Sequence, residues 1–166
     1  MNYSEARPLI KSGDILAWTH KGFGSWYDIQ VQAVRFFSRS EYTHTGIAFC
    51  VAERVFVLES VGVGIRMFPL SLELPFFWLP LPEWWDEDVA TAAFSKFGQP
   101  YSKLEAMRSM FHRFVPGKNS TWECAEYVQW LLGLKHTIHV NSVPALIVEW
   151  CQQRGAPLYL VEGEKT

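Results

Sequence analysis

The sequence predicts an α+β fold in which an antiparallel β-sheet packs against helices. Strand-like segments dominate residues 43–81, whereas helical patterns dominate from residue 86 onward. Strands followed by helices are typical of this fold class. The chain has 166 residues, of which 49 % are apolar and 16 % aromatic, and this is enough to bury a core. No repeat, low-complexity stretch or linker interrupts it, so we expect one domain over residues 1–166.

Six segments rich in β-branched and aromatic residues are the expected strands. They are Asp14–Trp18, Thr45–Val51, Arg54–Glu59, Ile65–Leu70, Phe76–Leu79 and Leu158–Val161. Only Ala52 and Glu53 separate the second segment from the third, so a two-residue hairpin turn is predicted there.

Five segments have helical patterns, and each begins at a residue that favours a helix start. Ser25 precedes residues 26–37, and Asp86 precedes a helix that Gly98 would end. Capping boxes start two more, Ser102 with Glu105 and Ser120 with Glu123. Ser142, followed by Pro144, starts the last one, which runs to about Gln153.

Charge and cysteine content exclude several classes of protein. The formal net charge is −2 and no Lys/Arg cluster occurs, which argues against nucleic-acid binding. Cys50, Cys124 and Cys151 are too widely spaced for a disulfide framework or a zinc site, and His136 with His139 lacks further ligands. We therefore expect no metal and no cofactor. The amino-terminal residues lack a signal-peptide pattern and no run is long enough for a membrane span, so we expect a cytoplasmic protein unless a phage or a specialised export system delivers it.

Cys124 is the first candidate for chemistry. It follows the predicted cap Ser120, so it is expected in the first turns of a helix, where backbone amides and the helix dipole favour a thiolate. Val128, Leu131 and Leu132 recur on its face, which turns it toward the sheet. A buried cysteine is more often a small core residue, and Cys50 and Cys151 are interpreted in that way.

His44 and Glu59 become partners if the hairpin turn has two residues. Gly46 then lies opposite Glu59 and His44 opposite Val61, which makes His44 and Glu59 diagonal neighbours on one face. A three-residue turn would move one strand's side chains to the other face and destroy this pairing. A cysteine nucleophile requires a base, and the base requires an orienting group. Cys124, His44 and Glu59 supply these three roles.

Five short motifs, in order along the chain, resemble the circularly permuted papain-like amidases of the YiiX type. This group belongs to the NlpC-type superfamily, which also contains lecithin:retinol acyltransferase-like enzymes. The motifs span about residues 12–144 and are Ser12-Gly13-Asp14-Ile15-Leu16, Tyr42-Thr43-His44-Thr45-Gly46-Ile47, Leu58-Glu59-Ser60, Gly98-Gln99-Pro100-Tyr101 and Trp122-Glu123-Cys124-Ala125-Glu126-Tyr127-Val128. The resemblance implies a permuted papain-like fold, in which the histidine precedes the cysteine.

The resemblance implies Cys124 as nucleophile, His44 as base and Glu59 as the third polar residue. Tyr101 and Trp122 are assigned to substrate binding, although Tyr101 fits an ordinary aromatic residue before a helix equally well. Asp14 matches a structural Gly-Asp turn. One departure is Ala125, where the group usually has serine; because an oxyanion hole would use backbone N–H groups, alanine should be tolerated.

The leading hypothesis is hydrolysis of an amide bond in a small peptide of the cell-wall (murein) type. The alternative is an acyltransferase or thioesterase acting on lipid or other acyl esters, with the aromatic segment 76–85 as an acyl groove or, more simply, as a buried strand and helix entry. A binding module without catalysis is the third hypothesis, and the presence of all three polar residues argues against it.

Overall fold

The computed structural model describes residues 1–19, 42–62, 64–81, 83–98, 124–138, 140 and 142–164. The elements in these ranges are α1 (Tyr3–Ala6), β1 (Ile15–Trp18), β2 (His44–Val51), β3 (Arg54–Val61), β4 (Gly64–Pro69), the 3-10 helix η1 (Leu70–Leu72), β5 (Phe76–Leu79), α3 (Glu87–Phe94), α5 (Cys124–Gly133), α6 (Pro144–Gln153) and β6 (Tyr159–Val161). The predicted α+β class is confirmed, and all six predicted strands are present with ends that move by no more than two residues.

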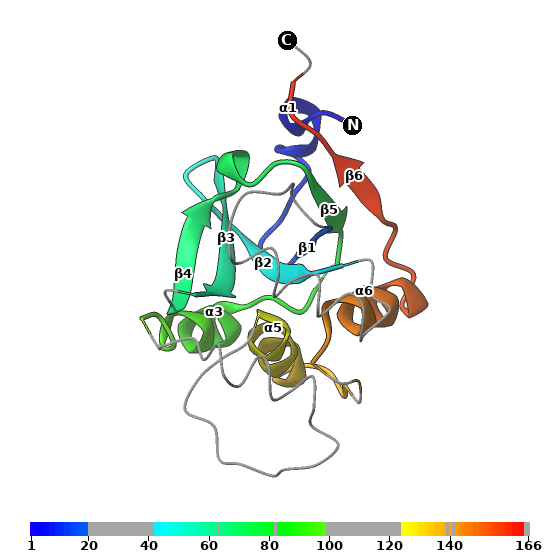
Figure 1. Cartoon of the computed structure of the whole chain (residues 1–166). Helices are drawn as coiled ribbons and strands as arrows, with labels where there is room; N and C mark the ends of the chain where they lie inside the picture. Colours follow the sequence, from blue (N-terminus) through cyan, green and yellow to red (C-terminus); the bar gives the residue numbers. More distant parts are fainter. Residues whose placement is uncertain are drawn as a thin grey trace.

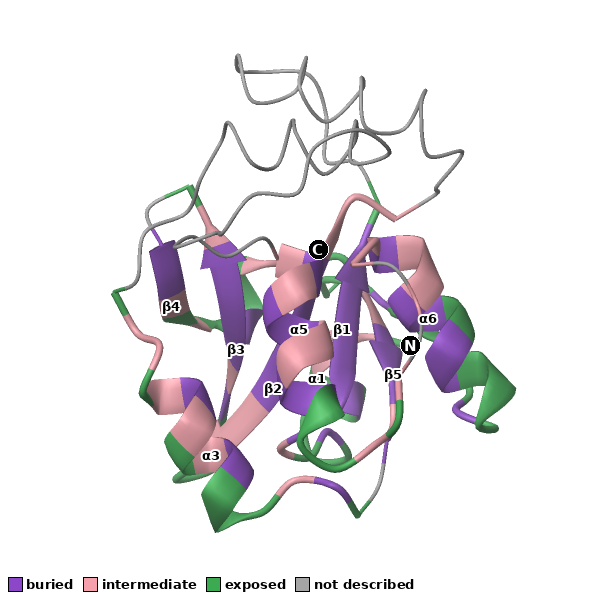
Figure 2. Cartoon of the chain, turned by 90° about the horizontal axis from the view of Figure 1, so that it is seen from below, coloured by how far each residue is buried: buried purple, intermediate pink, exposed green. Residues whose placement is uncertain are grey.

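The strands form one sheet in the order β4-β3-β2-β1-β5-β6, and every neighbouring pair is antiparallel. Helix α5 packs against β2 and β3, α6 packs against β1 and β5, and α3 contacts α5. These three helices therefore lie along one side of the sheet, as Figure 1 shows. In Figure 2, which is seen from below, α5 lies between α3 and α6 and beside strands that are coloured as buried.

Two groups of buried side chains hold the sheet, one on each face. The first joins the sheet to the helices and includes Ile15, Ile47, Leu58, Leu79, Val128, Leu131, Leu132 and Ile147. The second fills the opposite face beneath α1 and η1 and includes Ala6, Leu16, Trp18, Ala48, Val55, Val57, Leu70 and Phe76. Alternation of side chains along each strand produces this division.

The turn before β1 is fixed by Asp14, in agreement with the structural role expected for it. The buried carboxylate accepts hydrogen bonds from Lys11 N at 2.9 Å, Trp78 Nε1 at 2.8 Å and Leu81 N at 3.1 Å. Gly13 has φ +94°, and a Cβ there would lie 2.7 Å from Trp85 Cβ, so this position requires glycine.

The helix predictions need two corrections. Ser142 does not cap α6: the cap position is Val143, and the Ser142 hydroxyl instead donates to Gln129 Oε1 on α5. Helix α3 is capped by Asp86 as predicted, but it ends at Phe94, well before Gly98. The predicted helices that begin after Ser25 and Ser102, and the cap Ser120, lie outside the described residues. None of the described helices is both long and apolar enough to cross a membrane.

Candidate functional site

The β2–β3 hairpin has the two-residue turn that the sequence predicts. Ala52 and Glu53 have φ of 48° and 61°, the left-handed values that such a turn requires. Val51 pairs with Arg54, and the register continues to Ile47 opposite Leu58. Continued by one residue, this register sets Gly46 opposite Glu59, and Glu59 Cβ lies 3.5 Å from where a Cβ on Gly46 would be.

The hairpin brings His44 and Glu59 into direct contact. His44 is the first residue of β2, and its Nε2 lies 2.6 Å from Glu59 Oε2. The Glu59 side chain is only 3 % exposed and that of His44 is 18 % exposed. On β2, Gly46 packs closely against β3, because a Cβ there would lie 2.5 Å from Val57 Cγ2 and 3.5 Å from Glu59 Cβ. The predicted pairing is confirmed.

The Cys124 thiol reaches the same histidine from α5. A side-chain hydrogen bond links Cys124 to the His44 ring, and Cys124 is partly buried. Because Nε2 faces Glu59, the ring atom that remains for the thiol is Nδ1. Cys124 is the first residue of α5 as the structure describes it. The structure therefore brings together the three residues to which the sequence analysis assigns chemistry.

The charges of the site favour an imidazolium at neutral pH. Burial lowers the pKa of His44, but the charge and hydrogen bond of Cys124, and then those of Glu59, outweigh this effect and raise the pKa to about 10. For Glu59, burial raises the pKa of the carboxyl, but the hydrogen bonds and charges of His44 and Arg66 lower it by more than burial raises it. The pKa of Glu59 is therefore below its usual value. Glu59 is then a carboxylate that holds a charged His44 against the thiol.

Arg66 is a site residue that the sequence analysis missed. It lies directly opposite Glu59 in the β3–β4 pair, and its Nε and Nη2 atoms lie 2.8 and 2.6 Å from Glu59 Oε1. The sequence predicted the strand that carries Arg66, but the glycines before it left the β3–β4 register open. Had that register been known, the acid and base at facing positions would have signalled the pair.

The other two cysteines lie in different surroundings. Cys50 donates its thiol hydrogen bond to Ile10 O at 3.3 Å, and burial raises its pKa. Cys151 is fully buried, and burial raises its pKa to about 12. Both are consistent with the structural role expected for them.

The aromatic segment 76–85 belongs mostly to the core. Phe76, Trp78 and Trp84 are buried, Trp78 donates to Asp14, and Trp84 donates to Gly13 O at 2.9 Å. The segment therefore forms a buried strand and helix entry, and the acyl groove considered as an alternative has no support from these residues. The predicted substrate-binding residues Tyr101 and Trp122 lie outside the described residues.

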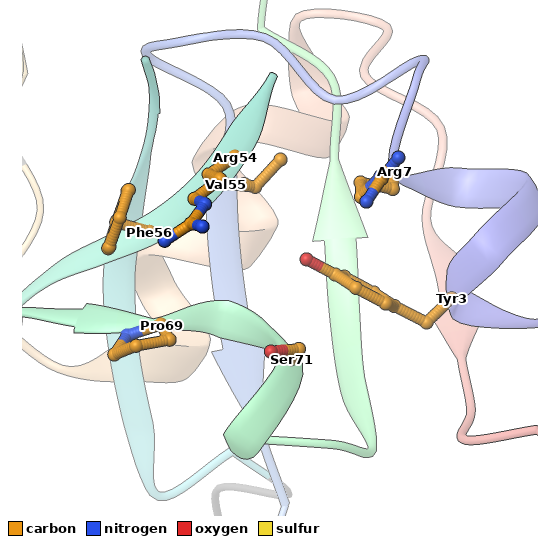
Figure 3. Close-up of a pocket in the computed structure, with 7 residues that line it drawn as sticks. All are labelled: Tyr3, Arg7, Arg54, Val55, Phe56, Pro69 and Ser71. Carbon is orange, nitrogen blue, oxygen red and sulfur yellow. The ribbon is translucent and has the colours of Figure 1, made fainter. Parts of the chain in front are cut away.

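A pocket of about 270 Å³ lies on the sheet away from Cys124, His44 and Glu59. Its lining comes from α1, β3, the end of β4 and η1: Tyr3, Arg7, Arg54, Val55, Phe56, Pro69 and Ser71 (Figure 3). The side chains of Arg7 and Arg54 are exposed. The pocket contains no member of the candidate site.

No family model matches the sequence, and no curated protein matches it. Among solved structures, the chain is similar to the crystal structure of the metalloprotein YiiX from Escherichia coli O157:H7. The identity is 18 %, the alignment covers 94 % of this chain and 98 % of that chain, and the TM-score is 0.58. The fold is YiiX-like.

The described part of this chain does not fit a metal centre of its own. Among the described residues, no group of three or more His, Cys, Asp and Glu side chains is placed to hold an ion. The centre of the His136 ring lies 6.2 Å from that of Trp84 and 5.4 Å from that of Trp150. His139 is outside the described residues.

Proposed function

We propose that the protein is a cysteine-dependent hydrolase that cleaves an amide bond through an acyl-enzyme on Cys124. The supporting observation is the position of His44: its Nε2 contacts Glu59 at 2.6 Å, and its ring is hydrogen-bonded to Cys124. A nucleophile on α5, a base on β2 and an orienting acid on β3 would thus be linked by direct contacts through His44. His44 and Glu59 precede Cys124 in the chain, which is the order of the permuted papain-like amidases that the motifs resemble.

The reaction follows from these contacts. An imidazolium beside the thiol stabilises the thiolate, which attacks the carbonyl carbon and forms a C–S bond. Backbone N–H groups at the Cys124 end of α5 stabilise the oxyanion. The C–N bond then breaks, and His44 gives its proton to the leaving amine. Water then attacks the acyl carbon of the thioester while His44 takes a proton from it; the C–S bond breaks, which releases the carboxylic acid and restores the thiolate beside the His44 imidazolium.

Murein-type peptides are the first substrates to test, because the resemblance implies them. The experiment follows amine release from a panel of such peptides, beside ester substrates, and detects the acyl-enzyme by intact-protein mass spectrometry. We expect amine release in the wild type, an adduct that maps to Cys124, and no turnover by Cys124→Ala. Cys50→Ala is the matched control and should remain active.

The same panel separates the alternatives. Turnover of acyl esters without amine release from any peptide would favour the acyltransferase or thioesterase hypothesis. Turnover that persists in Cys124→Ala would contradict both hypotheses. Binding of a peptide without any adduct or turnover would favour a binding module.

A further inference from the structure

Glu59 divides its two carboxylate oxygens between two partners. Oε2 contacts His44, and both contacting nitrogens of Arg66 meet Oε1. A carboxylate held at both oxygens cannot rotate away from the histidine without breaking a charge-assisted hydrogen bond. Because the Glu59 side chain is 3 % exposed, water is a poor substitute for either partner.

Arg66 is itself held on two sides. Its guanidinium carbon lies 4.2 Å from the centre of the Phe68 ring, and Nη2 lies 3.5 Å from Glu73 Oε1. The arginine side chain stays charged at neutral pH, and its planar guanidinium group donates hydrogen bonds in one fixed geometry. The Arg66 side chain is 33 % exposed, and its charged end lies 2.6 Å from Glu59 Oε1.

A second series of contacts connects Arg66 to His44 through Glu73 and Trp18. The backbone oxygen of Glu73 accepts a 2.7 Å hydrogen bond from Trp18 Nε1, and the Trp18 ring lies 5.3 Å from the His44 ring, centre to centre. A closed chain of contacts therefore runs from His44 through Glu59, Arg66, Glu73 and Trp18 back to His44. It fixes both the hydrogen-bonding edge and the face of the imidazole.

We propose that Arg66 is a positioning residue that keeps Glu59 ionised and aimed at His44, so that the Nδ1 edge of the ring faces the Cys124 thiol. This inference rests on the proposed cysteine chemistry. Arg66 acts through Glu59 and touches no reacting atom. Without its charge, the buried Glu59 carboxyl takes up a proton at higher pH, because Arg66 is one of the groups that lower its pKa. The negative partner of the imidazolium is then lost under mildly acidic conditions.

The test measures the rate of Cys124 alkylation by iodoacetamide from pH 4.5 to pH 8 in the full chain. In Arg66→Met we expect the acid limb of the profile to move to higher pH and the rate at pH 6 to fall about tenfold, the effect of losing one charge-assisted hydrogen bond of about 1.4 kcal/mol. Arg66→Lys keeps the positive charge but loses the planar guanidinium group. The acid limb of its rate profile should therefore lie at the same pH as in the wild type, whereas its alkylation rate at the plateau should stay below that of the wild type. Arg54→Met removes the same charge from an exposed position on the same sheet and should leave the profile unchanged.

Each outcome decides the matter. A wild type in which Cys124 reacts no faster than Cys50 would defeat the proposed function itself. A wild type with a fast Cys124, beside a folded Arg66→Met with an unchanged profile, would overturn only the role of Arg66. If Arg66→Met does not fold, Arg66→Lys decides: a profile equal to that of the wild type in both acid limb and plateau would overturn the proposal, because a simple ion pair tolerates lysine.

Discussion

Replacing Glu59 with glutamine reverses the hydrogen bond that orients His44. Arginine only donates, so the amide oxygen of Gln must face Arg66 and its NH₂ group must face His44 Nε2. Nε2 then becomes an acceptor, and the neutral ring carries its proton on Nδ1, the atom that faces the Cys124 thiol. A ring in this state cannot accept the thiol proton.

This arrangement sets the expected loss of amide hydrolysis and the expected loss of stability in Glu59→Gln. In serine proteases the corresponding change from acid to amide lowers turnover about 10⁴-fold through the same tautomer effect, so we expect a loss of about 10³- to 10⁴-fold in amide hydrolysis. Removing one partner of a fully buried ion pair costs about 3–5 kcal/mol. Here His44 is 18 % and Arg66 33 % exposed, so water reaches both. The free energy of unfolding should therefore fall by the smaller amount of about 1–3 kcal/mol.

The assays are urea unfolding, amide hydrolysis and Cys124 alkylation at pH 7, with Glu149→Gln as a matched control on the exposed face of α6. Glu149→Gln should change none of the three. A folded Glu59→Gln protein that keeps a third or more of the wild-type rates would refute the tautomer argument. A loss of stability without any loss in the rates of hydrolysis and alkylation would show that Glu59 has only a structural role.

Three further changes test other parts of the structure. Gly46→Ala places a methyl group 2.5 Å from Val57 Cγ2, so urea unfolding should give a loss of about 1–3 kcal/mol, and an unchanged midpoint would contradict the close approach. Asp14→Ala removes the acceptor of three hydrogen bonds, so we expect a loss of about 3 kcal/mol at about 1 kcal/mol each in the same assay, and a loss below about 1 kcal/mol would show that the turn does not depend on them. His136 has its pKa lowered by burial and then by Arg154, so the native state binds fewer protons than the unfolded state and loses stability as the pH falls below 6.5. His136→Phe should reduce the loss of stability between pH 7.5 and pH 5, and an identical loss in both proteins would place the acid sensitivity elsewhere.

The sequence predicted the sheet well because its strands are defined by local signals. Strand residues are concentrated in short segments, and the length of the Ala52-Glu53 turn sets the register of β2 and β3. From that register alone the contact between His44 and Glu59 followed, since side chains alternate along a strand. The approach of Cys124 to them required the packing of α5 on β2 and β3, and the periodicity of its apolar residues indicated which side faces the sheet.

The sequence predicted less where the outcome depends on tertiary contacts. Ser142 has the side chain of a helix cap, but its hydroxyl bonds Gln129 on a neighbouring helix instead. Arg66 looked like any polar residue on a strand, because only the β3–β4 register sets it against Glu59. The aromatic residues of segment 76–85 did not reveal from the sequence which of them are buried, and the structure places Trp78 and Trp84 in the core.

Selective alkylation of Cys124 tests the central claim most directly. Iodoacetamide is added at pH 6.5, and peptide mass spectrometry follows Cys124 beside Cys50 and Cys151, whose raised pKa values make them internal controls. We predict that Cys124 is modified at least about tenfold faster than either control, and that His44→Ala removes this advantage. Equal rates at the three cysteines, or a fast Cys124 that does not depend on His44, would contradict the account.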